Sequence, residues 1–449
     1  MRWNLKYAIR SYITSSMWLV PLAAILFYLV FQWVTYAIGG WLLRTGRLDQ
    51  ETAFLGLPME GARTMLETVI TLNLSFLVFT FGSLLVAIQV AGGQYTPRII
   101  ATTLLRDNVI RFTVGCFVFT MVFALRVVTR LDETVHQFFT FIAAVCGMFS
   151  IMAFLYLIDY AARFLRPVSI VAKVGQFGVA VIGSVYPDKT TRPRPVPSAG
   201  RLGSPDRIVV NVGPPGVVLA VDLAGLVTQA RQANGIIEFV PQVGDFVAVD
   251  EPLFRLYGGA SNIDDRQLRE SVVLGVERTM EQDPTFSFRI LVDIAIKALS
   301  AAINDPTTAV MAIDQLHRLL RLVGLRDLRG EELRDAAGEL GLVFRTPNWE
   351  DYVQLACTEI RHCGAGSIQV MRRLRSMLDN LIQTLPPHRH AELRQQLELL
   401  GRTVDAHYVF PEDRALAHIA DSQGLGGSLG VQPVRETPTV EGGTSDNSL

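Results

Sequence analysis

The sequence predicts an α-helical membrane protein with four transmembrane helices, followed by a cytoplasmic α+β domain that holds a small β unit and then a helical region. Half of the 449 residues are hydrophobic and only 18% are charged. The apolar residues gather before Pro167, which favours a membrane part and a water-soluble part over one large core. A chain of this length also favours at least two domains.

Four apolar stretches carry the membrane prediction. A helix needs about 20 apolar residues to cross the hydrocarbon layer. The stretches hold a single charge between them, Arg126 near the end of the third, and they cover Met17–Leu43, Val69–Val90, Phe112–Thr129 and Phe138–Ile158. A buried helix of a soluble protein is rarely apolar on every side, so the lipid bilayer is the predicted partner of all four.

Basic residues predict the topology. One side of the membrane receives Arg2, Lys6, Arg10, Arg98, Arg106, Arg111, Arg163, Arg166 and Lys173. The other side receives Arg44, Arg47, Arg63, Arg126 and Arg130. Because cytoplasmic loops carry the excess of Lys and Arg, we expect a multi-pass protein of the inner membrane with both termini in the cytoplasm.

A polar stripe on the second membrane stretch allows two interpretations. Asn73, Thr80 and Ser83 are spaced by seven and three residues, which places them on one helix face. Such a stripe can line a water-filled path. It can equally hydrogen-bond between helices and hold them together, and small or polar residues are common at such interfaces.

Composition divides the chain into five segments. We expect a transmembrane domain, a helix end with a Pro-rich linker, a β-rich unit, a helical domain and a disordered tail, at residues 1–166, 167–206, 207–262, 263–410 and 411–449. Prolines between Tyr186 and Arg207 exclude a packed element there, and Val-rich runs follow. Helical periodicity then begins with Arg266–Met280. The tail is rich in Gly, Ser and Thr with few apolar anchors.

The predicted helical domain contains a polar signature that also reads in two ways. Asp293 and Lys297 are four residues apart and can form an ion pair on one helix. The junction Asn304-Asp305-Pro306 offers oxygen atoms for a cation or a partner helix. Capping explains the same junction without a ligand, since Pro306 starts a helix and Asp305 can accept from the amide of Thr307 or Thr308.

Several of these motifs resemble a bacterial family of predicted membrane proteins, the domain of unknown function 2254 family. They are Gln94-Tyr95-Thr96-Pro97-Arg98, the turn Val243-Gly244-Asp245-Phe246-Val247, and the long run from Leu291 through Lys297, Ser300 and Asn304-Asp305-Pro306 to Ala309. The resemblance covers the first helix to about residue 410. Lys297 and Ser300-Ala301 replace an Arg and a Ser-Pro of the family. The resemblance implies an integral membrane protein and transfers no catalytic residues.

The sequence offers no catalytic constellation, so we do not expect an enzyme. P-loop and HExxH motifs are absent. Four cysteines without a CxxC pair predict neither a metal site nor a cofactor. A net charge of −1 without a basic cluster argues against nucleic acid as a partner.

Two functional hypotheses remain. In the first, a homo-oligomer forms a channel-like or sensor-like assembly that the cytoplasmic domain gates; four helices leave little room for an internal path, so a pore needs several subunits. In the second, the chain is a membrane-anchored scaffold or regulator whose domain binds a cytosolic protein.

Overall fold

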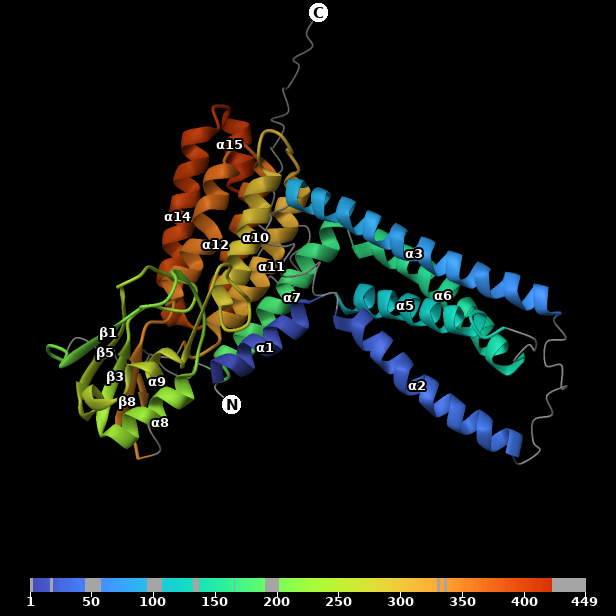
Figure 1. Cartoon of the computed structure of the whole chain (residues 1–449). Coiled ribbons are helices and arrows are strands. Elements are labelled where there is room, and N and C mark those ends of the chain that lie inside the picture. The colour runs from blue at the N-terminus through green and yellow to red at the C-terminus, as the bar shows by residue number, and fades with distance from the viewer. Residues whose placement is uncertain are drawn as a thin grey trace, which may run out of the picture.

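The protein has two lobes joined through helices α1 and α7 (Figure 1). The computed structural model describes residues 3–16, 19–44, 58–94, 107–131, 137–164, 166–189, 202–328, 332–334 and 337–421. One lobe is an elongated arm of long helices. The other lobe, residues 202–421, combines β-sheets with a helical bundle, and we call it the extramembrane domain.

The arm consists of α2 (Leu19–Arg44), α3 (Met59–Gln94), α5 (Asn108–Val128) and α6 (Gln137–Phe164). Among the described residues, four helices are long and apolar enough to cross a membrane: α3, α5, α6 and the connecting helix α7 (Pro167–Val185). Within α2, the apolar segment with described side chains is the shorter Leu19–Phe31.

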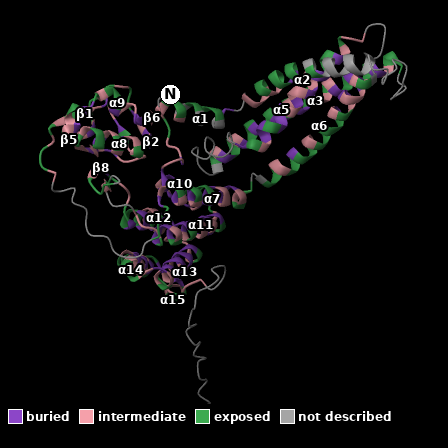
Figure 2. Cartoon of the chain, turned by 90° about the horizontal axis from the view of Figure 1, so that it is seen from below, coloured by how far each residue is buried: buried purple, intermediate pink, exposed green. Residues whose placement is uncertain are grey.

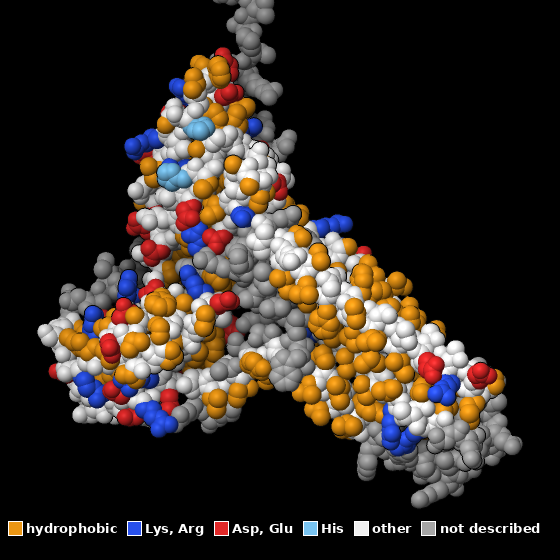
Figure 3. Space-filling model, turned by 45° about the horizontal axis from the view of Figure 1, so that its top comes forward, with side chains coloured by type: hydrophobic (Ala, Val, Ile, Leu, Met, Phe, Trp, Pro, Cys, Tyr) orange, Lys and Arg blue, Asp and Glu red, His pale blue; other side chains and the backbone are white. Residues whose placement is uncertain are grey.

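The outer surface of the arm is apolar, as a lipid-facing surface must be. Hydrophobic side chains cover the arm in the space-filling view, and charged ones gather at its far end (Figure 3). Val78 on α3 and Met148 on α6 are 67% and 66% exposed. Inside the arm, the rings of Phe76 and Phe154 stack with centroids 4.1 Å apart, and Phe117 packs beside them. This ring cluster joins α3, α5 and α6.

Helix α7 departs from the sequence prediction. Residues 167–206 were expected to hold a helix end and a linker, but Pro167–Val185 forms a helix of 19 residues. Pro167 occupies its first turn, where the missing amide costs nothing. Gly175 and Gly178 face α11, and a Cβ on Gly178 would lie 2.8 Å from Leu319. The apolar composition of α7 therefore also serves packing against the bundle.

The β unit contains two sheets. The five-stranded sheet has the order β1-β5-β3-β8-β7, with bounds Arg207–Val210, Pro252–Gly258, Gly235–Phe239, Leu340–Phe344 and Glu332–Arg334. The second sheet has the order β4-β2-β6, with bounds Phe246–Val247, Gly216–Val221 and Val272–Gly275. Helix α8 (Leu223–Ala233) packs on β3 and β8. The short helices η3 (Gly259–Asn262) and α9 (Asp265–Arg269) follow β5.

The predicted boundary between the β unit and the helical region was wrong. We expected one helix over Arg266–Met280, but it ends at Arg269, and β6 pairs with β2. Likewise β8, more than 60 residues beyond the predicted unit, pairs in parallel with β3. Helical periodicity cannot identify such strands, because their partners lie far away in the sequence.

The bundle packs α10 (Pro284–Ala298), α11 (Pro306–Gly324), α12 (Trp349–Cys363), α13 (Ile368–Thr384) and α14 (His390–His407), with η4 (Pro387–Arg389) before the last. Its buried residues continue through α7 into the base of the arm, forming one apolar core (Figure 2). This shared core fixes the position of the bundle relative to the membrane helices.

The predicted tail was also wrong at its start. Helix α15 (Pro411–Ala417) caps the bundle. Asp421 forms an ion pair with Arg373 of α13 at 3.3 Å, and Ser376 donates to the Asp421 carbonyl at 2.7 Å. These contacts anchor residues 411–421. The rest of the predicted tail lies outside the described residues.

Candidate functional site

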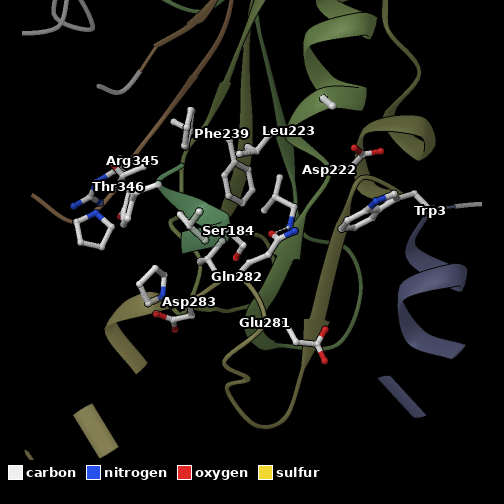
Figure 4. Close-up of a pocket in the computed structure, with 18 residues that line it drawn as sticks. Trp3, Ser184, Asp222, Leu223, Phe239, Glu281, Gln282, Asp283, Arg345 and Thr346 are labelled. Atoms are coloured by element: carbon white, nitrogen blue, oxygen red, sulfur yellow. Dashed lines mark hydrogen bonds between the residues drawn. The ribbon is translucent and has the colours of Figure 1, made fainter. Parts of the chain in front are cut away.

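A cavity of about 440 Å³ lies where α1 and the end of α7 meet the extramembrane domain (Figure 4). We call it the junction cavity. Four parts of the chain line it: α1 (Trp3–Ser15), the end of α7, the β unit and the start of α10. Among its lining residues are Trp3, Ser184, Phe239, Asp283 and Arg345. A ligand here would contact every unit that connects the arm to the extramembrane domain.

Local structure explains why this end of the sheet is open. Strands β3 and β8 run in parallel, and their carboxyl ends, Phe239 and Phe344, reach the cavity. Helix α8 precedes β3 and runs antiparallel to it, so the amino end of α8 lies beside the carboxyl end of β3, at the cavity. Asp222 caps that end by accepting from the Gly225 amide at 3.0 Å. Ligands of open α/β sheets commonly bind outside the carboxyl ends of parallel strands.

Asp283 and Pro284, at the start of α10, line the junction cavity. Asp283 is 3% exposed and caps α10 by accepting from the Phe286 amide at 3.1 Å. Arg278 donates to the same carboxylate at 2.9 Å. Burial raises the pKa of Asp283, although the charge and the hydrogen bonds of Arg278 act in the opposite direction. The Asp283 carboxylate therefore has a structural role, because its oxygens already accept from Arg278 and from the Phe286 amide.

The lining combines apolar rings with excess negative charge. Phe239 is 2% exposed and Tyr186 1% exposed. Among the described lining residues, Asp222, Glu281 and Asp283 are acidic and Arg345 is the one cationic side chain; Arg278 behind the lining balances Asp283, which leaves an excess of one negative charge. This combination favours a neutral or cationic aromatic molecule over an anion. Within the described residues, no group of three or more His, Cys, Asp or Glu side chains could hold a metal ion.

Helix α7 connects the junction cavity to the arm. Its last residues line the cavity, while Lys173, three turns earlier, donates to the Asp107 carboxylate at 2.8 Å. Asp107 caps α5, and Tyr160 of α6 donates to the same oxygen at 2.6 Å. Burial favours a higher pKa for Asp107, but the bonds from Lys173 and Tyr160 outweigh burial and lower that pKa. One carboxylate therefore joins α5, α6 and α7.

The predicted polar stripe is divided in the structure. Asn73 and Thr80 are 1% and 3% exposed, and they donate to the backbone carbonyls of Val69 and Phe76. Ser83 is exposed on the outer surface and donates to the Thr80 carbonyl at 3.0 Å.

Asn73 is buried in α3 near the height of two hydroxyls on α6 and α5. Gly147 lies opposite Val69, and Phe154 opposite Phe76, so α3 and α6 run in parallel with an offset of 78 residues that places Asn73 within one residue of the level of Ser150. Ser150 in turn donates to Thr120 of α5 at 3.1 Å. Sequence reasoning missed these two hydroxyls, because single hydroxyls in apolar helices are common and only the packing brings them together.

The signature residues occupy separate places. Gln94 ends α3, while Tyr95, Pro97 and Arg98 lie outside the described residues. Asp293 accepts from Arg289, one turn earlier, at 2.8 Å. Arg289 also donates to both oxygens of Glu359 in α12. The proposed partner Lys297 is exposed on the next turn.

The Asn304-Asp305-Pro306 junction has the geometry of a helix cap. Asp305 accepts from the Thr308 amide at 3.1 Å. Asn304 adopts a left-handed φ of 48°, and its amide donates to the Ser300 carbonyl at 2.8 Å. Pro306 starts α11. These contacts support the capping interpretation, since the Asp305 side chain is used within the turn.

These features define a membrane protein with an extramembrane α+β domain. The chain belongs to the family described as predicted membrane protein (DUF2254), whose model matches residues 14–380. It is similar to uncharacterized proteins of Mycobacterium bovis and Mycobacterium tuberculosis, each 26% identical over 431 residues, which cover 92% of this chain and 81% of the relative. No solved structure matches the chain.

Proposed function

We propose that the protein is a membrane-anchored sensor whose junction cavity binds a small aromatic molecule from the cytoplasm. The observation that carries this proposal is the origin of the lining: α1, α7, the β unit and α10 all contribute to one cavity. A ligand that contacts all four binds most tightly to one arrangement of them. It therefore shifts the population toward that arrangement.

Helix α7 supplies the route to the membrane. Ser184 and Tyr186 at its end contact the cavity, and Lys173 holds the base of α5 through Asp107. Tyr186 also lies 3.1 Å from the hydroxyl of Tyr352 in α12, inside the bundle. A displacement of α7 by ligand thus changes contacts with both the bundle and the arm.

The channel hypothesis receives less support. Within the described part of the arm, the polar stripe of α3 gives no support to a path through a single chain, since Asn73 and Thr80 are buried and bonded to their own helix. In our proposal, ligand binding therefore changes the arrangement of the helices and does not open a path for ions.

Ligand-induced stabilisation tests the proposal. We would measure the unfolding temperature of the full-length chain in detergent with nucleosides, their monophosphates and aromatic amines. We expect a neutral or cationic ring compound to raise it, and the matching monophosphate to raise it less. Ala224→Trp fills the cavity mouth and should remove the shift, whereas Thr228→Trp, exposed one turn away on α8, should keep it.

Hydrogen exchange then tests the relay. In the wild type, the active compound should slow amide exchange in α7 and at the first turn of α5. Equal stabilisation of the Ala224→Trp variant, or protection confined to the β unit, would contradict the sensor proposal.

A further inference from the structure

Helix α1 has two faces with different surroundings. On one face, Trp3 lines the junction cavity and stacks on Tyr7 with ring centroids 5.8 Å apart. The Tyr7 hydroxyl lies 3.3 Å from that of Thr279 in the extramembrane domain. The other face is apolar and exposed, with fractional exposures of 40–56% at Leu5, Ile9, Tyr12 and Ile13. Spacings of four, three and one residues make these four side chains one stripe.

The position of α1 indicates what covers this stripe. Helix α2 starts four residues after Ser15 and exposes Leu26 and Phe27 by 55% and 60%. Arg111, in the first turn of α5, donates to the Ile13 carbonyl at 2.8 Å. The end of α1 is therefore held at the level where the apolar helices of the arm begin. An apolar stripe at this level continues the lipid-facing surface of the arm.

The charge around α1 points to the kind of lipid. The first 48 residues contain no Asp or Glu, while Arg2, Lys6 and Arg10 precede the first apolar stretch. Lys6 is exposed. Basic residues next to an apolar helical stripe are typical of helices that lie in the interface of membranes containing anionic lipids.

We propose that α1 lies in the headgroup region of the bilayer, with its exposed stripe among the acyl chains and Lys6 bound to anionic phospholipids. The same helix then contacts lipid on one face and the junction cavity on the other. Lipid binding does not depend on the sensor function, because the stripe and the cavity lining are different residues of α1.

Photo-crosslinking of the full-length chain in nanodiscs tests this proposal. A benzophenone amino acid would replace Ile9 in the stripe or, as the matched control, Tyr7 on the opposite face. The nanodiscs would contain phosphatidylcholine alone or a mixture with phosphatidylglycerol. We expect lipid adducts at position 9, enriched in phosphatidylglycerol, and protein adducts within residues 272–284 at position 7.

Removing positive charge from α1 measures the electrostatic contribution to the binding of anionic lipid. Lys6→Gln should reduce the enrichment by about fivefold, the factor that corresponds to about 1 kcal/mol per basic residue near an anionic surface. The adduct at position 7 reports that α1 is still folded onto the domain. Adducts at position 9 to a second copy of the chain, equal yields with both lipids, or no lipid adduct would overturn the proposal.

Discussion

Lys173 and Asp107, 66 residues apart, form an ion pair of 2.8 Å at the base of the arm. The Asp107 side chain is 4% exposed and that of Lys173 is 26% exposed. Tyr160 donates to the same carboxylate oxygen. The pair joins α5 to α7, and α7 packs on α10 and α11 of the extramembrane domain.

We predict that Asp107→Asn destabilises the protein. It removes the negative charge that Lys173 and Tyr160 bind, and breaking a buried ion pair costs several kcal/mol in a dry site. Because Lys173 is partly exposed, we expect a smaller loss of about 1–3 kcal/mol. Thermal unfolding in detergent measures the loss. Asp159→Asn, which breaks an exposed pair with Arg163, is the matched control and should change little.

The effect of Asp107→Asn should depend on pH. The pKa of Asp107 is lowered in the folded protein, so the contribution of its carboxylate is fully present above the unfolded pKa of about 4. It is lost as the pH falls through the folded pKa. Unfolding measured from pH 7 to pH 3 should therefore show a constant difference between wild type and variant at first, and a shrinking one below about pH 4. A difference that grows on acidification would contradict this assignment.

The contact between α7 and α11 depends on glycine. A Cβ on Gly178 would lie 2.8 Å from Leu319 and 3.0 Å from the Cβ of Ser287, whereas nothing lies within 4 Å of a Cβ on Gly183 of the same helix. We expect Gly178→Ala to destabilise by about 1–3 kcal/mol through overpacking. Gly183→Ala should be neutral or stabilise by about 0.5–1 kcal/mol through helix propensity. Equal effects on the unfolding temperature would show that α7 does not dock here.

Capping at the bundle junction gives a further prediction. Asp305→Ala removes the acceptor for the Thr308 amide and should cost about 1 kcal/mol, while Asp305→Asn keeps an acceptor oxygen and should cost less. Chemical unfolding of the full chain measures both. If the junction instead held a cation, the Asp305→Asn variant would lose as much stability as Asp305→Ala, and added salts of divalent cations would stabilise the wild type alone.

The sequence predicted the apolar helices well because their signal is local. Stretches such as Val69–Val90 and Phe138–Ile158 are recognised from composition alone and lie within α3 and α6. The cap at Asp305 was equally predictable, since a proline in the first turn and an acceptor before it fix the geometry within four residues.

Other features depend on contacts between distant segments. Strand β6 looked helical in isolation, and its pairing with β2 decided its conformation. The junction cavity combines Trp3 with Phe239 and Arg345, which no spacing rule connects. Asp107 carried no motif, and its role appears only when α6 and α7 bring Tyr160 and Lys173 to it.

Asn73 distinguishes a structural from a conducting arm. Its amide nitrogen donates to the Val69 carbonyl, but its oxygen is buried without a hydrogen-bond partner. An unpaired buried acceptor costs about 1–3 kcal/mol, so Asn73→Leu should leave the unfolding temperature unchanged or raise it. Ion flux in liposomes gives the second readout, with Ser83→Ala as the matched control on the exposed surface of α3. Wild-type flux that disappears in Asn73→Leu and persists in Ser83→Ala would establish a conducting path. Our proposal expects no flux in any of the three, because Asn73 and Thr80 are buried and bonded to their own helix, and the hydroxyls of Thr120 and Ser150 bond to each other.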